Sequence, residues 1–433
     1  MSPSLKTSLV ISASLGATIA ALGAQPPDVV NSDANRNTAM GYSALRDLST
    51  GANNTAAGYT ALLYDTVGAN NTAFGASALF VNTTGSGNTA LGWESLGSNR
   101  TGSLNTGAGV HALTNNTTGV NGTALGAYSL NFNTTGENNT GIGTYSMSYT
   151  SIGSDNTGLG AFSLYSNVNG NNNTASGYES LTSNVSGSNN TAFGYSSLLA
   201  NETGYDNTAG GSFAMQSNYS GYENAAFGYE SLEGNSTGHK NAGFGEQSLF
   251  KNISGSHNIG VGYQAGYNVT ASNNIDIGNA GTAADNGTIR IGESGTHNAA
   301  FIAGIGTTHL TGAAVYVDSH GQLGVLASSE RYKTAIAPMT STSERLDKLR
   351  PVTFHLKSEP HGELQYGLIA EEVDRVFPEL VIRNDTGRIE GVRYDELAPI
   401  LLNEVQRQRQ QLALLEQQAG DMQAELKKLR AGR

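Results

Sequence analysis

The 433-residue sequence contains no cysteine, eight prolines and one tryptophan, and only 13% of its residues are charged. Without cysteine, neither disulfide bonds nor thiolate metal sites can stabilise the fold, which leaves packing or assembly. Basic residues are scarce in most of the chain: residues 37–278 carry four Lys and Arg against 13 Asp and Glu, whereas 16 of the 23 basic residues follow residue 330. A weakly charged, acidic body argues against nucleic acid or an anionic membrane as a partner, because both attract basic surfaces.

Long apolar runs are also scarce. One stands near the N-terminus, from Leu9 to Leu22, with Lys6 before it and small residues up to Ala24. A run this short, diluted by Ser and Thr, is typical of a secretory signal peptide rather than of a transmembrane anchor. We therefore expect residues 1–24 to be a signal peptide cleaved near Ala24. The mature protein would then have no membrane span and would be secreted or held at the cell surface.

Residues 37–278 repeat with a period of seventeen, in the unit N-T-A-x-G-x-x-S-L-x-x-N-x-T-G-x-x. Asparagine occupies the first position from Asn37 to Asn258, with Gly122 as the exception, and glycine stands four residues later in all fourteen copies. A fixed short period predicts a solenoid, because one coil cannot bury its apolar side until a neighbour stacks on it. The expected fold is therefore mainly β: a β-solenoid or β-roll rod over residues 37–278.

Each part of the unit has an expected task. The N-T-A-x-G segment should be a strand, and the T-G glycine should adopt a positive φ that closes the coil. Asparagines in register should form hydrogen-bonded ladders along the rod. The interior is expected to combine the leucine of the ninth position, from Leu45 to Leu249, with the apolar residue of the fourth, namely Met40, Phe74, Leu91, Leu125, Ile142, Leu159, Phe193, Phe227 and Phe244.

Aromatic residues recur at the sixth position of the unit. Such a column either packs against the next coil or a neighbouring subunit, or forms a stripe on which a carbohydrate stacks. Both interpretations stay open, so a carbohydrate or another cell-surface ligand is a candidate partner. The residues are Tyr42, Tyr59, Trp93, Tyr178, Tyr195, Tyr229 and Tyr263.

The repeat resembles the head region of trimeric autotransporter adhesins, which are parallel β-rolls built on an N-S-x-A-I-G unit. The resemblance covers residues 37 to about 278, and the period here is longer than the usual one in that family. It implies that three chains assemble side by side.

The periodicity ends before a different kind of sequence. Short β-branched segments predict a β neck over residues 279–325, and a small α+β domain should follow over residues 326–428. Within it, a helix should end before Pro351 and a strand should follow. Apolar residues at alternating spacings of three and four then predict a coiled coil over residues 401–430, the alternative being one amphipathic helix packed on its own domain. The seam would be Val405, Gln408, Leu412, Leu415, Ala419, Met422, Leu426 and Leu429.

Several motifs of this domain resemble the intramolecular chaperone of endosialidases and other phage tail spikes and fibres. They are S-S-E-R-Y-K from Ser328, L-R-P-V-T-F-H-L-K, Y-G-L-I-A-E-E-V-D-R-V-F-P-E-L-V and V-R-Y-D-E-L-A-P-I-L-L-N-E-V-Q-R-Q. The resemblance implies a homotrimer whose terminal domain helps the upstream fibre to fold and is released by autoproteolysis. It aligns Ser328 with the nucleophile and Lys333 with its base, whereas Ser329 replaces an Asp of the family pattern S-D-x-R-x-K. The cut would fall among Ala327, Ser328 and Ser329.

The chemistry is reasonable for these residue types, because a serine hydroxyl becomes a nucleophile when a neutral lysine accepts its proton. His355 is a further candidate to orient the reaction, although a histidine in a strand is more often simply packed. The sequence predicts no cofactor and no metal site.

The expected function is thus an exported trimeric fibre or adhesin that is also a self-cleaving serine endopeptidase. The alternative is an adhesin whose terminal domain stays attached as a stalk. A polysaccharide-degrading β-helix enzyme fits less well, because the repeats lack clustered Asp, Glu, Arg or His.

Overall fold

The computed structural model describes residues 31–302, 314–318, 321–339, 341–384 and 386–431. The expected signal peptide lies outside these ranges. The chain divides into two compact units, residues 1–301 and 302–433. Within the described ranges, no helix is both long enough and apolar enough to cross a membrane.

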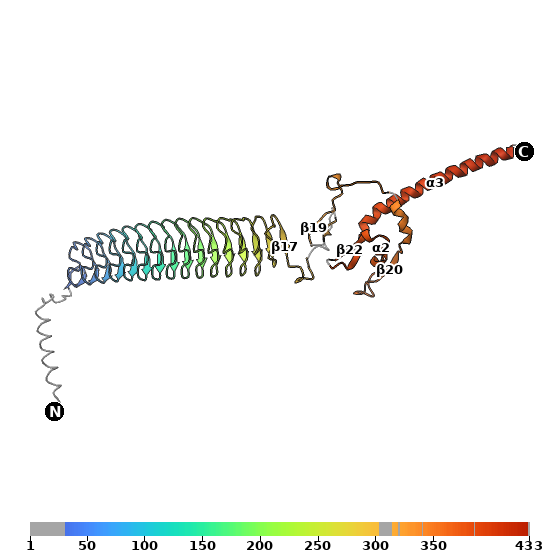
Figure 1. Cartoon of the computed structure of the whole chain (residues 1–433). Coiled ribbons are helices and arrows are strands. Elements are labelled where there is room, and N and C mark those ends of the chain that lie inside the picture. Colours follow the sequence, from blue (N-terminus) through green and yellow to red (C-terminus); the bar gives the residue numbers. More distant parts are fainter. Residues whose placement is uncertain (1–30, 303–313, 319–320, 340, 385, 432–433) are drawn as a thin grey trace, which may run out of the picture. The chain divides into compact units, whose positions relative to one another are not determined.

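The first unit is a parallel β-solenoid, which confirms the fold expected for the repeat (Figure 1). Each strand pairs in register with the strand one coil away, as Thr174 does with Thr191. The sheet continues past residue 278, where the repeat was expected to end, because β16 and β17 stack in the same way through Ile275 and Ile289. The short β1 (Asn31–Ser32) runs antiparallel to β2 at the other end. The parallel strands are β2 (Thr38–Met40), β3 (Thr55–Ala57), β4 (Thr72–Phe74), β5 (Thr89–Leu91), β6 (Thr106–Ala108), β7 (Thr123–Leu125), β8 (Thr140–Ile142), β9 (Thr157–Leu159), β10 (Thr174–Ser176), β11 (Thr191–Phe193), β12 (Thr208–Gly210), β13 (Ala225–Phe227), β14 (Ala242–Phe244), β15 (Ile259–Val261), β16 (Ile275–Ile277) and β17 (Ile289–Ile291).

The interior of the solenoid confirms one expected column and corrects the other. The ninth-position residues, such as Leu79 and Leu232, are fully buried. The fourth-position residues are exposed, and the small residue before them, such as Ala73 or Ala192, is buried instead. Side chains of a strand alternate between its two faces, so a buried third residue directs the second and the fourth outward. The interior of each coil is filled by the leucine together with this small residue.

The exposed fourth-position residues form one row along the outer face of the sheet, here called the apolar stripe. Its members stand one per strand and are joined by the in-register pairing, as Phe227 is to Phe244. The large members are Met40, Phe74, Leu91, Leu125, Ile142, Leu159, Phe193, Phe227, Phe244, Val261, Ile277 and Ile291.

The glycine of the T-G pair serves a purpose other than the expected one. A positive φ occurs at the glycine after the strand, as at Gly75 with φ +136°, and at the buried leucine, as at Leu79 with φ 50°. The T-G glycine is needed for space: a Cβ at Gly85 would lie 2.3 Å from the Gly102 carbonyl oxygen and 2.4 Å from the Asn82 side-chain oxygen. The turn therefore excludes a side chain because the next coil is too close.

Two buried ladders of asparagine run along the rod, as expected. In the first, Asn54 donates its backbone N–H to the Asn37 side-chain oxygen at 2.8 Å, and its side-chain amide donates to the Gly68 carbonyl at 2.8 Å. In the second, the Asn99 amide donates to the Asn82 side-chain oxygen at 2.8 Å. Each coil thereby satisfies polar groups that its own turn leaves buried.

The second unit is a small α+β assembly around its own apolar core. The described core residues are Val373, Phe377, Leu380, Val381, Val392, Leu397 and Ile400. The helix and strand expected on either side of Pro351 are present. The elements are β18 (Tyr316–Val317), β19 (Leu323–Gly324), η3 (Glu330–Tyr332), η4 (Ser341–Lys348), β20 (Val352–Phe354), β21 (Gln365–Gly367), α2 (Ala370–Val376), η5 (Pro378–Leu380), β22 (Val381–Arg383), β23 (Ile389–Val392) and α3 (Tyr394–Ala431).

The long helix α3 changes character along its length. Leu397 and Ile400 are buried in the core of the unit, whereas Leu412, Leu415 and the other large apolar seam residues are exposed. The packing of α3 on its own domain is thus confined to its first turns. The remaining turns carry an apolar seam that is exposed among the residues the structure describes.

Candidate functional site

Ser328 and Lys333 lie side by side on the segment between β19 and η4. The Lys333 ammonium nitrogen donates to the Ser328 hydroxyl oxygen at 3.4 Å, and both residues are exposed. The two side chains that the sequence predicted as nucleophile and base are therefore already in contact in one chain. Catalytic geometry of this kind is often long before the reactive complex forms.

A single turn of 3₁₀-helix explains how residues five apart in sequence come together. Ser329 caps η3: its hydroxyl accepts from the Arg331 backbone N–H at 3.4 Å and from the Arg331 Nε at 3.3 Å. At the other end, the Lys333 backbone N–H donates to the Glu330 carbonyl at 3.1 Å. The turn folds the chain back, so the lysine side chain reaches the serine that precedes the cap.

His355 lies directly after β20, in the connection that leads to β21. Its ring nitrogen Nδ1 lies 3.0 Å from the Gly362 carbonyl oxygen, within the connection between β20 and β21. His355 is exposed and follows the strand, so it is not the packed strand residue that the alternative expected. The hypothesis that His355 orients the reaction gains no contact from this geometry.

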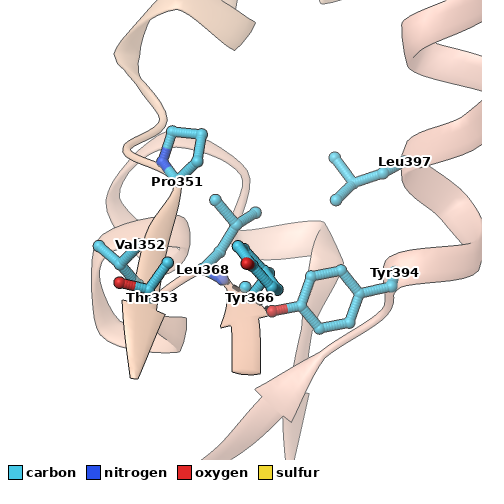
Figure 2. Close-up of a pocket in the computed structure, with 8 residues that line it drawn as sticks. Pro351, Val352, Thr353, Tyr366, Leu368, Tyr394 and Leu397 are labelled. Carbon is cyan, nitrogen blue, oxygen red and sulfur yellow. Dashed lines mark hydrogen bonds between the residues drawn. The ribbon is translucent and has the colours of Figure 1, made fainter. Parts of the chain in front are cut away.

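An open, largely apolar groove of about 540 Å³ lies beside the same hairpin (Figure 2). Tyr394, at the start of α3, closes one side of it, and its hydroxyl accepts from the Leu368 backbone N–H at 2.8 Å. A Cβ at Gly367 would lie 2.6 Å from that hydroxyl. The lining consists of apolar residues and a glycine together with Thr353 and two tyrosines. The lining residues are Pro351, Val352, Thr353, Tyr366, Gly367, Leu368, Tyr394 and Leu397.

The position of the Ser328–Lys333 pair coincides with the start of a family match. Residues 328–382 match the chaperone of endosialidase, Peptidase_S74. The match begins at Ser328, includes Lys333 and confirms the resemblance inferred from the motifs. Neither the curated proteins nor the solved structures contain a match to this chain. Chaperone-of-endosialidase domains are associated with trimerisation and autoprocessing.

Arginines hold together the elements of the matched segment, residues 328–382. Arg345 on η4 places its guanidinium 4.1 Å from the centre of the buried Phe377 ring and donates to the Val376 carbonyl at 2.9 Å. Arg350 pairs with Glu372 on α2 at 2.6 Å. These contacts fix η4 against α2, downstream of the serine and lysine.

The aromatic residues of the rod form a column that sequence reasoning found only in part. Rings stand in contact on consecutive coils from Trp93 through to Tyr229, switching between the sixth and seventh positions of the unit. Tyr178 and Tyr195, for example, stack with centroids 5.7 Å apart and planes 8° apart. Other neighbours meet edge to face, as Tyr195 and Phe213 do at 79°. Binding of a carbohydrate by stacking on this column stays a prediction.

Two buried carboxylates went unnoticed in the sequence. Asp65 stands in the second asparagine ladder and Asp276 in the row of small buried residues, and each has one oxygen without a hydrogen-bond partner. Burial raises the pKa of each to about 6, and at Asp276 the nearby Asp285 adds to the rise. Asp285 itself pairs with Arg290, which lowers its pKa to about 2. Among the described residues, no group of three or more metal-binding side chains is present.

Proposed function

We propose that the protein is an exported, trimeric fibre or adhesin-like surface protein. Its C-terminal domain would act as an intramolecular chaperone for trimerisation and then release itself by autoproteolysis next to Ser328. The observation that carries the proposal is the contact between Ser328 and Lys333 at the first residue of the matched segment, downstream of the solenoid. A carbohydrate or other surface ligand for the rod is part of the same proposal.

The geometry favours the bond between Ala327 and Ser328 as the one that breaks. When the Ser328 hydroxyl oxygen attacks the Ala327 carbonyl carbon, it closes a five-membered ring, whereas attack on its own carbonyl would close a strained four-membered ring. Lys333 accepts the hydroxyl proton and passes it to the departing amide nitrogen. The resulting ester then takes up water, which leaves a carboxylate on Ala327 and regenerates the Ser328 hydroxyl with a free amino group.

Assembly would be the trigger of this reaction. Ser328 and Lys333 are exposed in the single chain, and a serine hydroxyl needs a base that can accept its proton. Burial disfavours the charged form of a lysine. Covering of the pair by neighbouring chains would therefore supply the base, so that cleavage follows folding and does not precede it.

The cleavage is tested on the chain from Gln25 onward, expressed as the native sequence and as Ser328→Ala, Lys333→Arg and Ser329→Ala. We expect two fragments from the native chain, the second beginning at Ser328 by mass spectrometry. Ser328→Ala and Lys333→Arg should stay intact, because one lacks the hydroxyl and the other retains a charged group. Ser329→Ala is the matched control and should still be cut. An intact native chain would refute the peptidase and favour the attached stalk.

The assembly step is tested on helix α3, where two adjacent leucines provide a matched pair. Leu414 and Leu415 are 56% and 60% exposed, but only Leu415 belongs to the predicted coiled-coil seam. A charge at a seam position is costly because helix association buries it. In the Ser328→Ala background, Leu415→Asp should give monomers by light scattering while Leu414→Asp stays trimeric. Equal behaviour of the two variants would rule out this seam as the contact.

A further inference from the structure

The outer face of the solenoid sheet carries the apolar stripe beside a row made mostly of threonines, and it is uncharged from β2 to β15. No residue of strands β2 to β15 carries a charge. From Met40 to Val261, the large members of the apolar stripe are between 37% and 51% exposed. Parallel sheets are normally covered on both faces. One face is covered by the buried leucines, whereas no described residue of the chain covers the apolar stripe on the other.

The exposed area is large enough to matter. With a full side-chain area of about 150–250 Å² for an aromatic residue and somewhat less for an aliphatic one, the stripe exposes roughly 800 Å² in total. The largest apolar patch on a typical monomer is about 300–600 Å². A standard protein interface takes about 800 Å² from each partner. The stripe therefore has the dimensions of a complete interface.

The spacing of the stripe selects the partner. Its members recur once per strand, at about 4.8 Å, because every strand is paired in register with the next coil. A second copy of the same rod has the same pitch, so an apolar or small residue meets its counterpart at every level from β2 to β17 except that of Ser176. Small members of the row, such as Gly210 beside Phe227, leave room for the larger residues at neighbouring levels: a Cβ at Gly210 would lie 2.7 Å from the Phe227 ring.

We propose that the apolar stripe is the face on which the rods of three copies pack, parallel and in register, around a common axis. This inference rests on the trimer of the proposed function and assigns the surface of the rod that assembles. Under this inference the aromatic column is not part of the interface, and its ring contacts stabilise the stacking of coils within each chain. In the proposed trimer, the α3 seams would hold the chains together at the C-terminal helices, and the apolar stripe would hold them together along the rod.

The absence of cysteine in the native sequence allows a direct test by single-cysteine cross-linking of the full chain. Leu125→Cys and Ile142→Cys place a thiol on neighbouring strands of the stripe. Ile152→Cys is the control, because Ile152 is a 56% exposed apolar residue of the same rod that lies outside the strands. Each variant is combined with Ser328→Ala, checked by light scattering, and treated with a mild oxidant or a short bismaleimide before a denaturing gel.

We expect most of the protein to migrate as a cross-linked species in the Leu125→Cys and Ile142→Cys variants, and this fraction should not change on dilution. The Ile152→Cys variant should show little cross-linking. Two stripe positions are used so that a local defect in one variant cannot decide the result. Trimers that do not cross-link at the stripe would overturn this inference and leave the trimer intact. Monomers by light scattering would overturn both. Equal cross-linking at all three positions would show random collision and would also reject the stripe.

Discussion

Replacing Asp65 by Asn should stabilise the N-terminal end of the rod at neutral pH. Asp65 occupies a ladder position that is Asn in most coils, and its side chain is completely buried. One oxygen accepts from the Gly68 N–H at 2.9 Å and from the Asn82 amide at 3.2 Å, while the other has no partner. In the next coil, the Asn82 amide donates to the Gly85 carbonyl at 2.9 Å. Asn at position 65 would make the equivalent bond to Gly68 and remove the buried charge.

The magnitude follows from the pKa of Asp65, which burial raises from 3.8 to about 6. The folded state then binds the proton more tightly than the unfolded state. Stability is therefore full below about pH 4, falls as the pH rises to about 6, and stays lower above it. The loss amounts to about 3 kcal/mol per chain. Asp65→Asn should recover most of it at about pH 8 and have little effect at about pH 4.

The assay is native-state hydrogen exchange of the first coils, because a repeat array opens locally and need not melt as one unit. The native and variant chains are compared at both pH values after correction for intrinsic exchange rates. The contributions of Asp276 and Asp285 are common to both chains and cancel. Asp155→Asn is the control, because Asp155 is exposed and accepts from the Asn138 amide at 2.9 Å. Equal stabilisation at both pH values, or none at about pH 8, would refute the reasoning.

Three further variants examine the coil itself. Leu232→Ala should cost about 2–5 kcal/mol per chain, because it leaves a cavity between coils, and an unchanged melting curve would contradict the interior assigned here. Gly194→Ala should destabilise by more than about 1 kcal/mol, since its φ of +123° disfavours a side chain and its Cβ would lie 2.7 Å from Gly211. Thr150→Asn should stabilise by about 1 kcal/mol, because the Thr150 hydroxyl is buried without a partner in the second ladder; chemical denaturation measures both of these changes.

The period of seventeen was sufficient to predict the solenoid, because a repeat without insertions permits only one way for successive coils to stack. It was not sufficient to predict which side of the strand faces inward. Phe74 and Phe193 look like core residues by size, yet Ala73 and Ala192 are the buried ones. Which residue faces inward depends on the space between the strand and the row of buried leucines. A strand that lies close to that row leaves room only for a small side chain. That distance is a property of the folded coil rather than of its composition.

The motifs around Ser328 and Lys333 were sufficient to predict which residues form the candidate site. They were not sufficient to predict how the two side chains are arranged. Five residues of sequence separation do not reveal whether two side chains touch. The contact depends on η3, a single turn capped by Ser329. The aromatic column was found only in part for a related reason, since its rings alternate between two repeat positions and a search of one position finds gaps. Aromatic or histidine residues at either position in consecutive coils were the signal.

A rod of identical coils has a physical difficulty that explains why a non-repeating domain would be joined to it. Successive coils of one chain are nearly alike, because Asn54 with Asn37 and Asn190 with Asn173 make the same hydrogen bond at 2.8 and 2.9 Å. A neighbouring chain shifted by one coil would therefore meet a very similar surface. Irregular positions such as Gly122 are too few to select one register strongly. Register must then be set by a part of the chain that occurs once. Under the proposed function that part is the C-terminal unit, and its removal after assembly costs nothing, because the stacked coils by then hold one another in place.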